Sequence, residues 1–178
     1  KKTQDIYQIA IDFAASYHKE QKVTGKDYSY VVHLSNVAME VMFAINNTNE
    51  FLNKNLAISV ALLHDIIEDT KVTYNDILSE FGEDIANGVS ALTKNENIHK
   101  SEQMIDSLNR IVLQPKEIWI VKMADRITNL QPPPHYWDYE KKLYYFEESK
   151  IIYNKLKVAN SYLAERLLSK IENYKQYL

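Results

Sequence analysis

Apolar residues recur every three or four positions over most of the chain, which is the spacing of one buried helix face. Polar stretches interrupt this pattern, and we expect a helix in each interval between them. The expected helices span about residues 5–21, 30–45, 73–81, 83–92, 101–113, 116–130 and 139–177, with a break near residue 160 and a further helix that starts near residue 52. The pattern therefore predicts an all-α fold of roughly eight to ten helices.

Residues with defined roles at helix ends support these boundaries. Asp5 is a candidate N-cap of the first helix, and Thr73 followed by Asp76 resembles a capping box. Pro115 suits the first turn of a helix, where its missing amide hydrogen is not needed. The proline run 132–134 should end that same helix, because proline cannot continue the hydrogen-bond ladder.

Composition narrows the class of protein. The 178 residues suit a single domain covering 1–178, and only three glycines and four prolines favour long helices. The formal net charge is -3 and the basic residues are spread along the chain, so we expect no nucleic-acid partner. The absence of cysteine excludes disulfides, thiolate zinc sites and cysteine nucleophiles. No secretion signal or bilayer-length apolar run is visible, so we expect a cytoplasmic protein without a membrane partner.

The stretch 61–70 sets four ionisable side chains into an apolar pattern. His64 and Asp65 are adjacent, and Glu68 and Asp69 each follow one of them by four residues, so a continuous helix would carry them as two neighbouring stripes. The residues before this stretch are apolar on nearly every side, as in a central helix. So many charged groups beside a core are costly unless a metal ion, a positive partner or a substrate compensates.

Two further residues, His33 and Asp125, lie in apolar helical surroundings elsewhere in the chain. With His64 and Asp65 they offer two imidazoles and two carboxylates, a mixed set that suits manganese, iron, cobalt or zinc and leaves positions for water. Each residue alone has a simpler explanation, since a lone histidine is more often a satisfied core or capping residue and Asp125 could pair with Arg126 or Lys122. Their joint occurrence favours a divalent metal site.

The other three histidines lack this context. We expect His18 and His99 to face solvent or to pack against neighbours. His135 follows three prolines and should lie in a loop. None of them is predicted to be a metal ligand.

The order histidine, histidine-aspartate, aspartate on successive helices resembles the HD superfamily of metal-dependent phosphohydrolases. A narrower similarity lies in the flanking residues. Segment 64–70 (HDIIEDT) resembles the HDxxEDT motif of the RelA/SpoT-type alarmone hydrolases, and segment 122–130 (KMADRITNL) resembles their KxADRxxNL motif. Segment 30–33 (YVVH) is similar to their YxxH, and Phe81-Gly82 also falls where that family has it. The similarity covers most of the chain without a synthetase part, and so points to a stand-alone (p)ppGpp hydrolase.

This resemblance implies an HD-type helical bundle that removes the 3′-pyrophosphate from guanosine tetra- or pentaphosphate, giving GDP or GTP and pyrophosphate. It implies that the four ligands named above hold a divalent metal, for which we expect manganese. Such an ion lowers the pKa of bound water from about 15.7 towards 7 and offsets phosphoryl charge. Glu68 would orient or deprotonate the water, and Asp69 would assist proton transfer or hold the site through hydrogen bonds. For both acids, the simpler alternative is solvation of a helix end.

The resemblance also implies contacts with a small-molecule nucleotide substrate. Asn129 would lie against the nucleoside, and Tyr145 would flank the sugar or base, although its two aromatic neighbours compete for the inward face. Lys100 would contact phosphate, with Lys94 as the alternative. Arg126 within the KxADRxxNL motif is a further candidate contact.

The chain departs from this family just before the first histidine. The family usually carries an Arg-Lys pair where this chain has Val23 and Thr24. Lys22 or Lys26 could replace the pair, but without the planar fork of arginine. Segment 131–137 is also shorter than the matching loop of the animal-type small hydrolases. The alternatives are therefore an HD phosphohydrolase acting on an adenosine alarmone, a nucleoside monophosphate or an NADPH-type phosphate, or a non-catalytic nucleotide-binding or antitoxin-like module.

Overall fold

The computed structural model describes residues 1–178 and contains α-helices without a β-strand. The helices are α1 (Thr3–Tyr17), α2 (Val31–Asn46), α3 (Lys54–Leu63), α4 (Ile66–Asp69), α5 (Tyr74–Phe81), α6 (Glu83–Leu92), α7 (Lys100–Ile111), α8 (Lys116–Asn129), α9 (Tyr139–Leu156) and α10 (Ser161–Tyr174). Short 3₁₀ turns follow α9 and α10, and one isolated bridge joins Lys22 to Ser29. The all-α prediction and the expected number of helices are confirmed.

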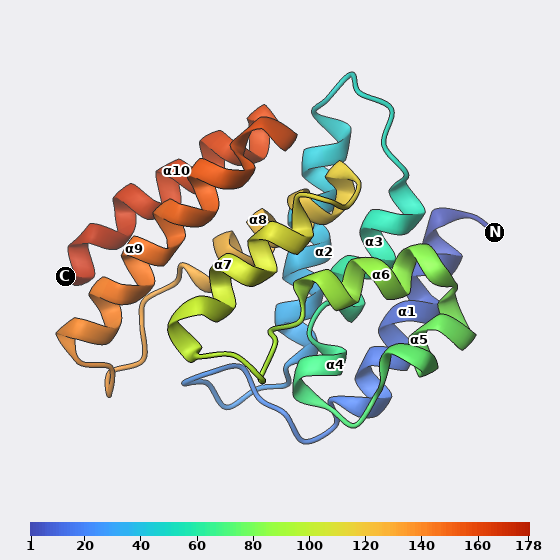
Figure 1. Cartoon of the computed structure of the whole chain (residues 1–178), viewed down its shortest axis with the longest axis horizontal. Coiled ribbons are helices and arrows are strands. Elements are labelled where there is room, and N and C mark those ends of the chain that lie inside the picture. The colour runs from blue at the N-terminus through green and yellow to red at the C-terminus, as the bar shows by residue number, and fades with distance from the viewer.

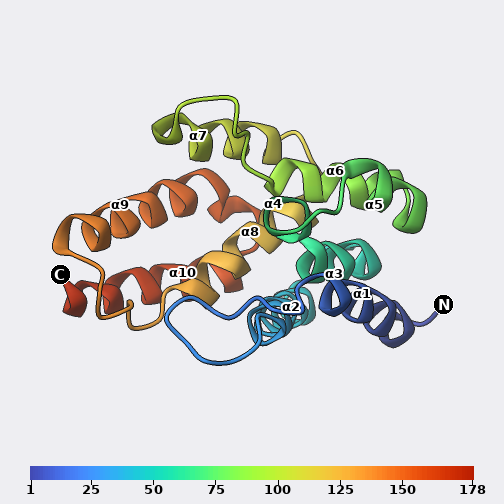
Figure 2. The ribbon, with the colours of Figure 1, turned by 90° about the horizontal axis from the view of Figure 1, so that it is seen from below.

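Helix α8 runs between two sets of helices (Figures 1 and 2). On one side, α9 and α10 form an antiparallel pair that packs on α8. On the other side, α3 contacts α1, α2 and α8. Helices α4 to α7 complete the remaining face, where α6 contacts α3 and α7.

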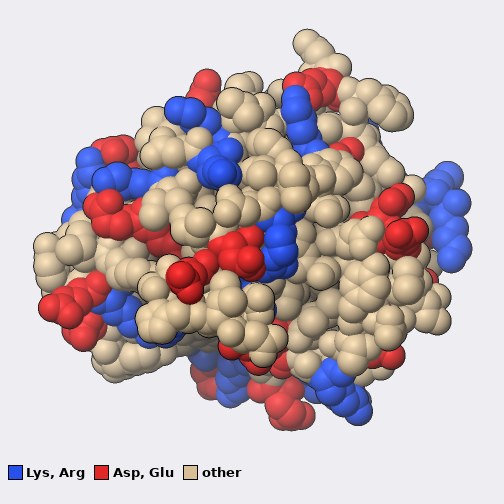
Figure 3. Space-filling model, in the orientation of Figure 1, with Lys and Arg blue, Asp and Glu red and all other residues tan.

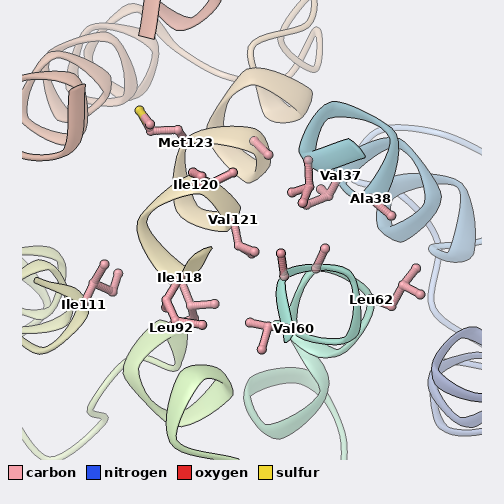
Figure 4. Close-up of a cluster of buried hydrophobic side chains, with 14 of the residues drawn as sticks. Val37, Ala38, Val60, Leu62, Leu92, Ile111, Ile118, Ile120, Val121 and Met123 are labelled. Carbon is pink, nitrogen blue, oxygen red and sulfur yellow. The ribbon is translucent and has the colours of Figure 1, made fainter. Parts of the chain in front are cut away.

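The core is centred on α3 and α8. Every residue from Leu56 to Leu63 is buried, and so is every residue from Ile120 to Ile127. Figure 4 shows apolar side chains from α2, α3, α6, α7 and α8 meeting in one cluster. A helix that is apolar on all sides must lie inside the molecule, so the prediction of a central helix before the charged stretch is confirmed.

The charged stretch itself differs from the expected continuous helix. Helix α3 ends at Leu63, His64 is its C-cap, and Asp65 adopts φ -101° and ψ 0° before the separate one-turn helix α4 begins. The expectation of two polar stripes on one helix is therefore wrong. His64 and Asp65 lie in the break between α3 and α4, with one ligand atom of each within 4.8 Å of the other.

The start of α1 also differs from the prediction, whereas the start of α5 agrees with it. The N-cap of α1 is Lys2, and Asp5 lies inside the helix, where its carboxylate accepts a hydrogen bond from the Lys2 amide at 3.1 Å. Helix α1 ends at Tyr17, earlier than expected. At α5, Thr73 and Asp76 form the predicted capping box.

The C-terminal helices are joined to the rest of the chain by specific polar contacts. The predicted break occurs at Asn160, whose side chain caps α10 and also donates to the Ala44 carbonyl oxygen at 3.1 Å. Arg166 of α10 donates to the buried carboxylate of Glu40 in α2 at 2.6 to 2.9 Å. Pro115 directly precedes α8 as its N-cap, rather than lying in its first turn.

The surface carries both signs of charge. Figure 3 shows acidic and basic side chains interspersed over the face that it displays, without a broad basic area. None of the helices combines the length and the apolar character that crossing a bilayer would require.

Candidate metal centre and active-site pocket

Four donor groups from three parts of the chain converge at one point. His33 lies in the first turn of α2, His64 and Asp65 lie at the end of α3, and Asp125 lies in α8. One ligand atom from each lies within 4.8 Å of all the others. The Nε2 atoms of the two histidines are 3.4 Å apart, and they lie 3.2 and 3.4 Å from Asp125 Oδ1. The structure thus brings together all four residues that the sequence indicated as ligands.

Hydrogen bonds around the cluster orient its donor atoms. The Nδ1 atom of His64 lies 2.7 Å from the Ala61 carbonyl oxygen, which can only accept. Nδ1 therefore carries the hydrogen, and the neutral ring presents the Nε2 lone pair to the cluster. Asp125 accepts hydrogen bonds from Asn129 Nδ2 at 2.9 Å and from Lys122 Nζ at 3.4 Å. Such outer contacts hold ligand side chains in place.

The electrostatic balance of the cluster favours ionised carboxylates. Burial alone would raise the pKa of Asp65, but the adjacent His64 brings that pKa to about 2. Burial would also raise the pKa of Asp125, but Lys122 and the two histidines hold that pKa well below its usual range. The two carboxylates in turn raise the pKa of His64 well above its usual range, although burial opposes them. The cluster is therefore a place where a proton and a metal cation compete.

The donor set fits a first-row divalent ion. Neighbouring ligands of an octahedral ion, at about 2.1 Å from it, lie about 3 Å apart. The shortest and longest ion pairs between His and Asp in the cluster are 2.9 and 3.7 Å. Two imidazoles and two carboxylates suit such an ion and leave further positions for water and substrate. The chemistry of the donors supports a divalent metal without selecting one element.

Tyr30, which directly precedes α2, contacts the cluster. Its hydroxyl donates to Asp65 Oδ2 at 2.5 Å, and its ring lies between those of His18 and His33, at 5.3 and 5.0 Å between centroids. Burial, followed by the nearby Asp65, raises the pKa of Tyr30, which keeps the hydroxyl protonated as a donor. Sequence reasoning used Tyr30 only as part of a motif and missed this contact.

The acids Glu68 and Asp69 border the same pocket from α4. Glu68 Oε1 accepts the backbone amide of Lys94 at 2.9 Å, and Asp69 Oδ2 accepts Gln21 Nε2 at 2.8 Å. Burial raises the pKa of Glu68 above its usual range, and Lys94 opposes the shift. Burial also raises the pKa of Asp69, and the hydrogen bond from Gln21 opposes it. Both acids are therefore suited to exchanging protons closer to neutral pH than ordinary carboxyl groups.

A cavity of about 800 Å³ opens in front of the cluster, and both acidic and basic side chains line it. Lys94 and Lys100 both line it, so each of the two alternatives for a phosphate contact faces the cavity. Lys141, which sequence reasoning missed, also lines it, and its Nζ atom lies 4.6 Å from the centre of the Trp137 ring. The sequence feature that could have indicated Lys141 is its position in the first turn of the helix after the proline run.

A second cavity of about 520 Å³ adjoins the first. Its walls include the loop before α2 and the proline run, and it contains the expected positions Val23, Thr24 and Lys26. The two walls meet where Gly25, at φ +73°, lies so close to Pro134 that a Cβ on the glycine would be 3.0 Å from Pro134 Cγ. This contact closes one side of the cavity.

Asn129 and Tyr145 border both cavities. Tyr145 is half-buried and packs edge-on against Trp137 at 5.5 Å, whereas Tyr144 is exposed and Phe146 lies in the core. Of the three competing aromatic residues, Tyr145 is therefore the one at the junction of the cavities.

Arg126 lies behind Tyr145 and is only 4% exposed. Its guanidinium group donates to Glu148 at 2.5 Å and to Ser149 at 3.2 Å, and it lies 4.0 Å from the centre of the Tyr145 ring. These contacts hold Tyr145 in place. The substrate contact expected for Arg126 stays a prediction.

The remaining histidines have three different environments. His18 is 1% exposed, so solvent exposure is excluded and the alternative of packing is confirmed. The sequence feature that indicates burial of His18 is its spacing, because it follows the buried Ala14 by one helical turn. His99 is exposed and caps α7, and His135 lies in the expected loop.

Known proteins resemble this chain over most of its length. Residues 10–161 match the model of the HD domain family. The guanosine-3′,5′-bis(diphosphate) 3′-pyrophosphohydrolase of Aquifex aeolicus is 32% identical over 147 residues, which are 80% of this chain and 18% of that protein. The MESH1 enzyme of Xenopus tropicalis, which has the same enzyme name, is 28% identical over 163 residues, or 89% of this chain and 88% of that protein.

Solved structures have the same fold. One, described as a metazoan ortholog of SpoT that hydrolyses ppGpp, matches with a TM-score of 0.82 at 24% identity and covers 97% of each chain. Another, from Listeria monocytogenes, matches with a TM-score of 0.64 at 21% identity and covers 84% of this chain. The family match over residues 10–161 shows that the chain belongs to the HD domain family.

Proposed function

We propose that this protein is a divalent-metal-dependent hydrolase that removes the 3′-pyrophosphate from guanosine tetra- and pentaphosphate. The observation that carries the proposal is the placement of Glu68 in the lysine-lined cavity that also contains His64, Asp65 and Asp125. This arrangement combines a metal site, a proton acceptor and positive charge for phosphate. The Xenopus relative, whose name gives this activity, matches 89% of the chain and supports the same reaction.

The four clustered donors would hold the ion, for which we propose manganese. When bound, the ion supplies activation of a water molecule and withdrawal of charge from the phosphoryl group. Tyr30 keeps Asp65 oriented through its 2.5 Å hydrogen bond, and Asn129 and Lys122 do the same for Asp125. These residues prepare the site before substrate enters.

Glu68 is the proposed acceptor of the water proton. One of its oxygens is engaged by the Lys94 amide, which leaves Oε2 free to take the proton. The water oxygen then bonds to the phosphorus attached to the ribose 3′ oxygen, and the bond between that phosphorus and the 3′ oxygen breaks. Asp69, whose pKa is raised by burial, gives the proton that the 3′ oxygen takes up. The products are pyrophosphate and GDP or GTP, and exchange with solvent restores both acids.

The two cavities suggest how the substrate lies. Lys94, Lys100 and Lys141 surround the larger cavity and would neutralise the pyrophosphate. Asn129 and Tyr145 stand at the junction and would contact the nucleoside, whose base would extend into the smaller cavity. Lys26 at its rim is the proposed charged contact on that side.

The test is to incubate the protein with manganese and guanosine tetraphosphate and to follow pyrophosphate release. Parallel reactions contain adenosine tetraphosphate, ordinary nucleoside monophosphates and NADPH, with orthophosphate release also measured. Pyrophosphate from the guanosine compound supports the proposal. Orthophosphate from ordinary nucleotides, without any pyrophosphate release, would overturn it.

One observation favours a second substrate class. Val23 and Thr24 line the smaller cavity where the similar hydrolases usually carry an arginine and a lysine. A site without that cationic pair relies more on shape and on the Asn129 amide to select the base. The alternative is therefore hydrolysis of an adenosine alarmone, and the adenosine reaction in the same assay distinguishes it.

A further inference from the structure

A buried histidine outside the metal cluster is connected to Asp69 through one glutamine. The Nδ1 atom of His18 lies 2.7 Å from Gln21 Oε1, and Gln21 Nε2 donates to Asp69 Oδ2 at 2.8 Å. The proposed reaction uses neither His18 nor Gln21. Because Asp69 is the candidate proton donor, whatever fixes its carboxylate affects the chemistry.

The chemistry of the three groups sets the direction of these hydrogen bonds. The Asp69 oxygen accepts, so the end of the Gln21 amide that faces it is the NH2 group. The amide oxygen then faces His18, and because it only accepts, Nδ1 of His18 carries the hydrogen. The Nε2 atom of His18 is buried without a hydrogen-bond partner, so a second hydrogen there would be an unpaired donor. His18 is therefore the donor, through Nδ1, at the start of this chain of hydrogen bonds.

The first two members of this chain of hydrogen bonds are held firmly. His18 is 1% exposed and packs on the ring of Tyr30. The backbone amide of Gln21 donates to the His18 carbonyl oxygen, and its own carbonyl oxygen accepts from the Tyr30 amide, both at 2.9 Å. Asp69, by contrast, remains partly accessible to solvent and is the last residue of the one-turn helix α4. The hydrogen bonds thus run from a fixed imidazole to a carboxylate with little support of its own.

We propose that His18 and Gln21 are positioning residues for Asp69. The imidazole fixes the rotation of the Gln21 amide, and the amide holds Oδ2 so that Oδ1 is left for proton transfer. The role of Asp69 in the reaction rests on the proposed function, whereas the hydrogen-bond chain does not. His18 does not line either cavity, whereas Gln21 borders the larger one. The effect of His18 should therefore appear in turnover and in the state of the Asp69 carboxyl group, and not in substrate binding.

Two substitutions at His18 separate positioning from packing. His18→Phe keeps a buried ring against Tyr30 but removes the Nδ1 donor, whereas His18→Asn loses the ring but can place an amide NH2 near Nδ1. We expect His18→Phe to lower kcat about tenfold with little change in KM or manganese affinity, and His18→Asn to recover most of that loss. His135→Phe, the same change at an exposed loop histidine, is the control. Normal turnover in His18→Phe together with a larger loss in His18→Asn would show that His18 only packs.

A substitution at Gln21 tests whether the two residues act through one path. Gln21→Met keeps the length of the side chain and removes both hydrogen bonds. We expect its loss of kcat to match that of His18→Phe, and the double variant to lose no more than either alone. Losses that multiply in the double variant would overturn the proposal.

The carboxyl pKa of Asp69, followed by carbon-detected NMR, gives a test that needs no substrate. Removing a donor from a carboxylate raises its pKa, so both His18→Phe and Gln21→Met should raise that of Asp69. Asp65 and His64, which also act on the pKa of Asp69, are kept in both variants, whereas His18→Phe additionally removes the effect of His18 itself. Gln21→Met keeps His18 and is therefore the decisive variant. An unchanged Asp69 pKa in Gln21→Met would overturn the proposal. A raised pKa in a protein that does not hydrolyse the guanosine compound would instead overturn only the proposed function.

Discussion

At the metal end of the pocket the donor atoms come from helices, whereas at the other end the walls are two loops. His33, His64 and Asp125 are buried and lie in or next to α2, α3 and α8. The smaller cavity is enclosed by the loop before α2 and the proline run after α8, which meet at Gly25 and Pro134. Both ends share Tyr30, but they are supported by different kinds of structure.

The metal end would carry out the reaction, whereas the loop end would select the base. At the metal end, loss of one carboxylate or histidine leaves other buried charges without a partner. Substitution there should therefore lower both metal affinity and turnover. At the loop end, side chains are exposed, and their replacement changes contacts with the base without disturbing the core. The effect of a substitution on metal binding and turnover should therefore be largest at the helices and smallest at the loops.

The largest effect is expected for Asp65→Ala. The change removes one donor and also the acceptor of the Tyr30 hydroxyl, so tight metal binding and pyrophosphate release should both be abolished. Calorimetric titration with manganese and the pyrophosphate assay measure the two losses. Asp12→Ala, at an exposed position of α1, is the control. Normal manganese affinity in Asp65→Ala would remove Asp65 from the ligand set.

Glu68→Gln should separate catalysis from metal binding. The amide cannot accept the water proton, so kcat should fall by about 10²–10⁴-fold, the usual contribution of general acid–base catalysis. The metal donors are untouched, and manganese affinity should stay near that of the unchanged protein. Full turnover in Glu68→Gln would show that another group accepts the proton.

The pH dependence of turnover should show the raised pKa of Glu68. A proton acceptor works only when it is deprotonated, so activity should fall about tenfold per pH unit below that pKa. Burial raises this pKa, and Lys94 lowers it through its backbone amide and, to a smaller extent, through its charge. Lys94→Met removes only the charge, so it should move the acidic limb of the kcat profile modestly to higher pH. Lys71→Met, an exposed lysine, is the comparison. An acidic limb that stays in place in Lys94→Met contradicts the assignment.

Moderate effects are expected for the lysines of the larger cavity. Lys100→Met and Lys141→Met should each raise KM roughly tenfold with a smaller change in kcat, because a charged hydrogen bond to phosphate is worth about 1.4 kcal/mol at a partly exposed site. Steady-state kinetics measure both constants. Lys150→Met, an exposed lysine of α9 paired with Glu147, should change neither. Unchanged KM values would place the pyrophosphate elsewhere.

The smallest effect is expected where the two loops meet. Gly25→Ala forces a side chain into a backbone with φ +73° and against Pro134, so it should raise KM a few-fold while metal affinity is kept. Gly82 has a similar φ of +89° but no neighbour within 4 Å of an added Cβ, so Gly82→Ala measures the backbone cost without a clash. Equal KM values in the two variants would show that the loop contact does not shape the smaller cavity.

Most helices could be predicted because their periodicity is a local property of the sequence. The break between α3 and α4 could not, since His64-Asp65 contains neither glycine nor proline, and the turn depends on the contacts that the two side chains make. The prediction of Asp5 as N-cap was wrong for a related reason. An aspartate at a helix start can be the N-cap or can lie three residues after it, and Asp5 does the latter, with Lys2 as the N-cap. Local patterns predict that a helix exists better than where it ends.

The metal ligands could be recognised because they form a motif, but their supports could not. The hydrogen bond from Tyr30 to Asp65 and the path from His18 to Asp69 join residues that are distant in the sequence. Their residue types are ordinary, and their function follows only from the packing of the loop before α2 on α4. Lys141 escaped notice because lysine is common along α9.

The end of α3 at the metal cluster has an electrostatic consequence of its own. The peptide dipoles of a helix add up to about half a negative charge at its C-terminus, and α3 ends at Leu63, directly before two of the donors. The main chain therefore contributes a field that attracts a cation, and no side-chain substitution at the donors removes it. Residual weak cation affinity in a donor-less variant would accordingly report on the polypeptide backbone.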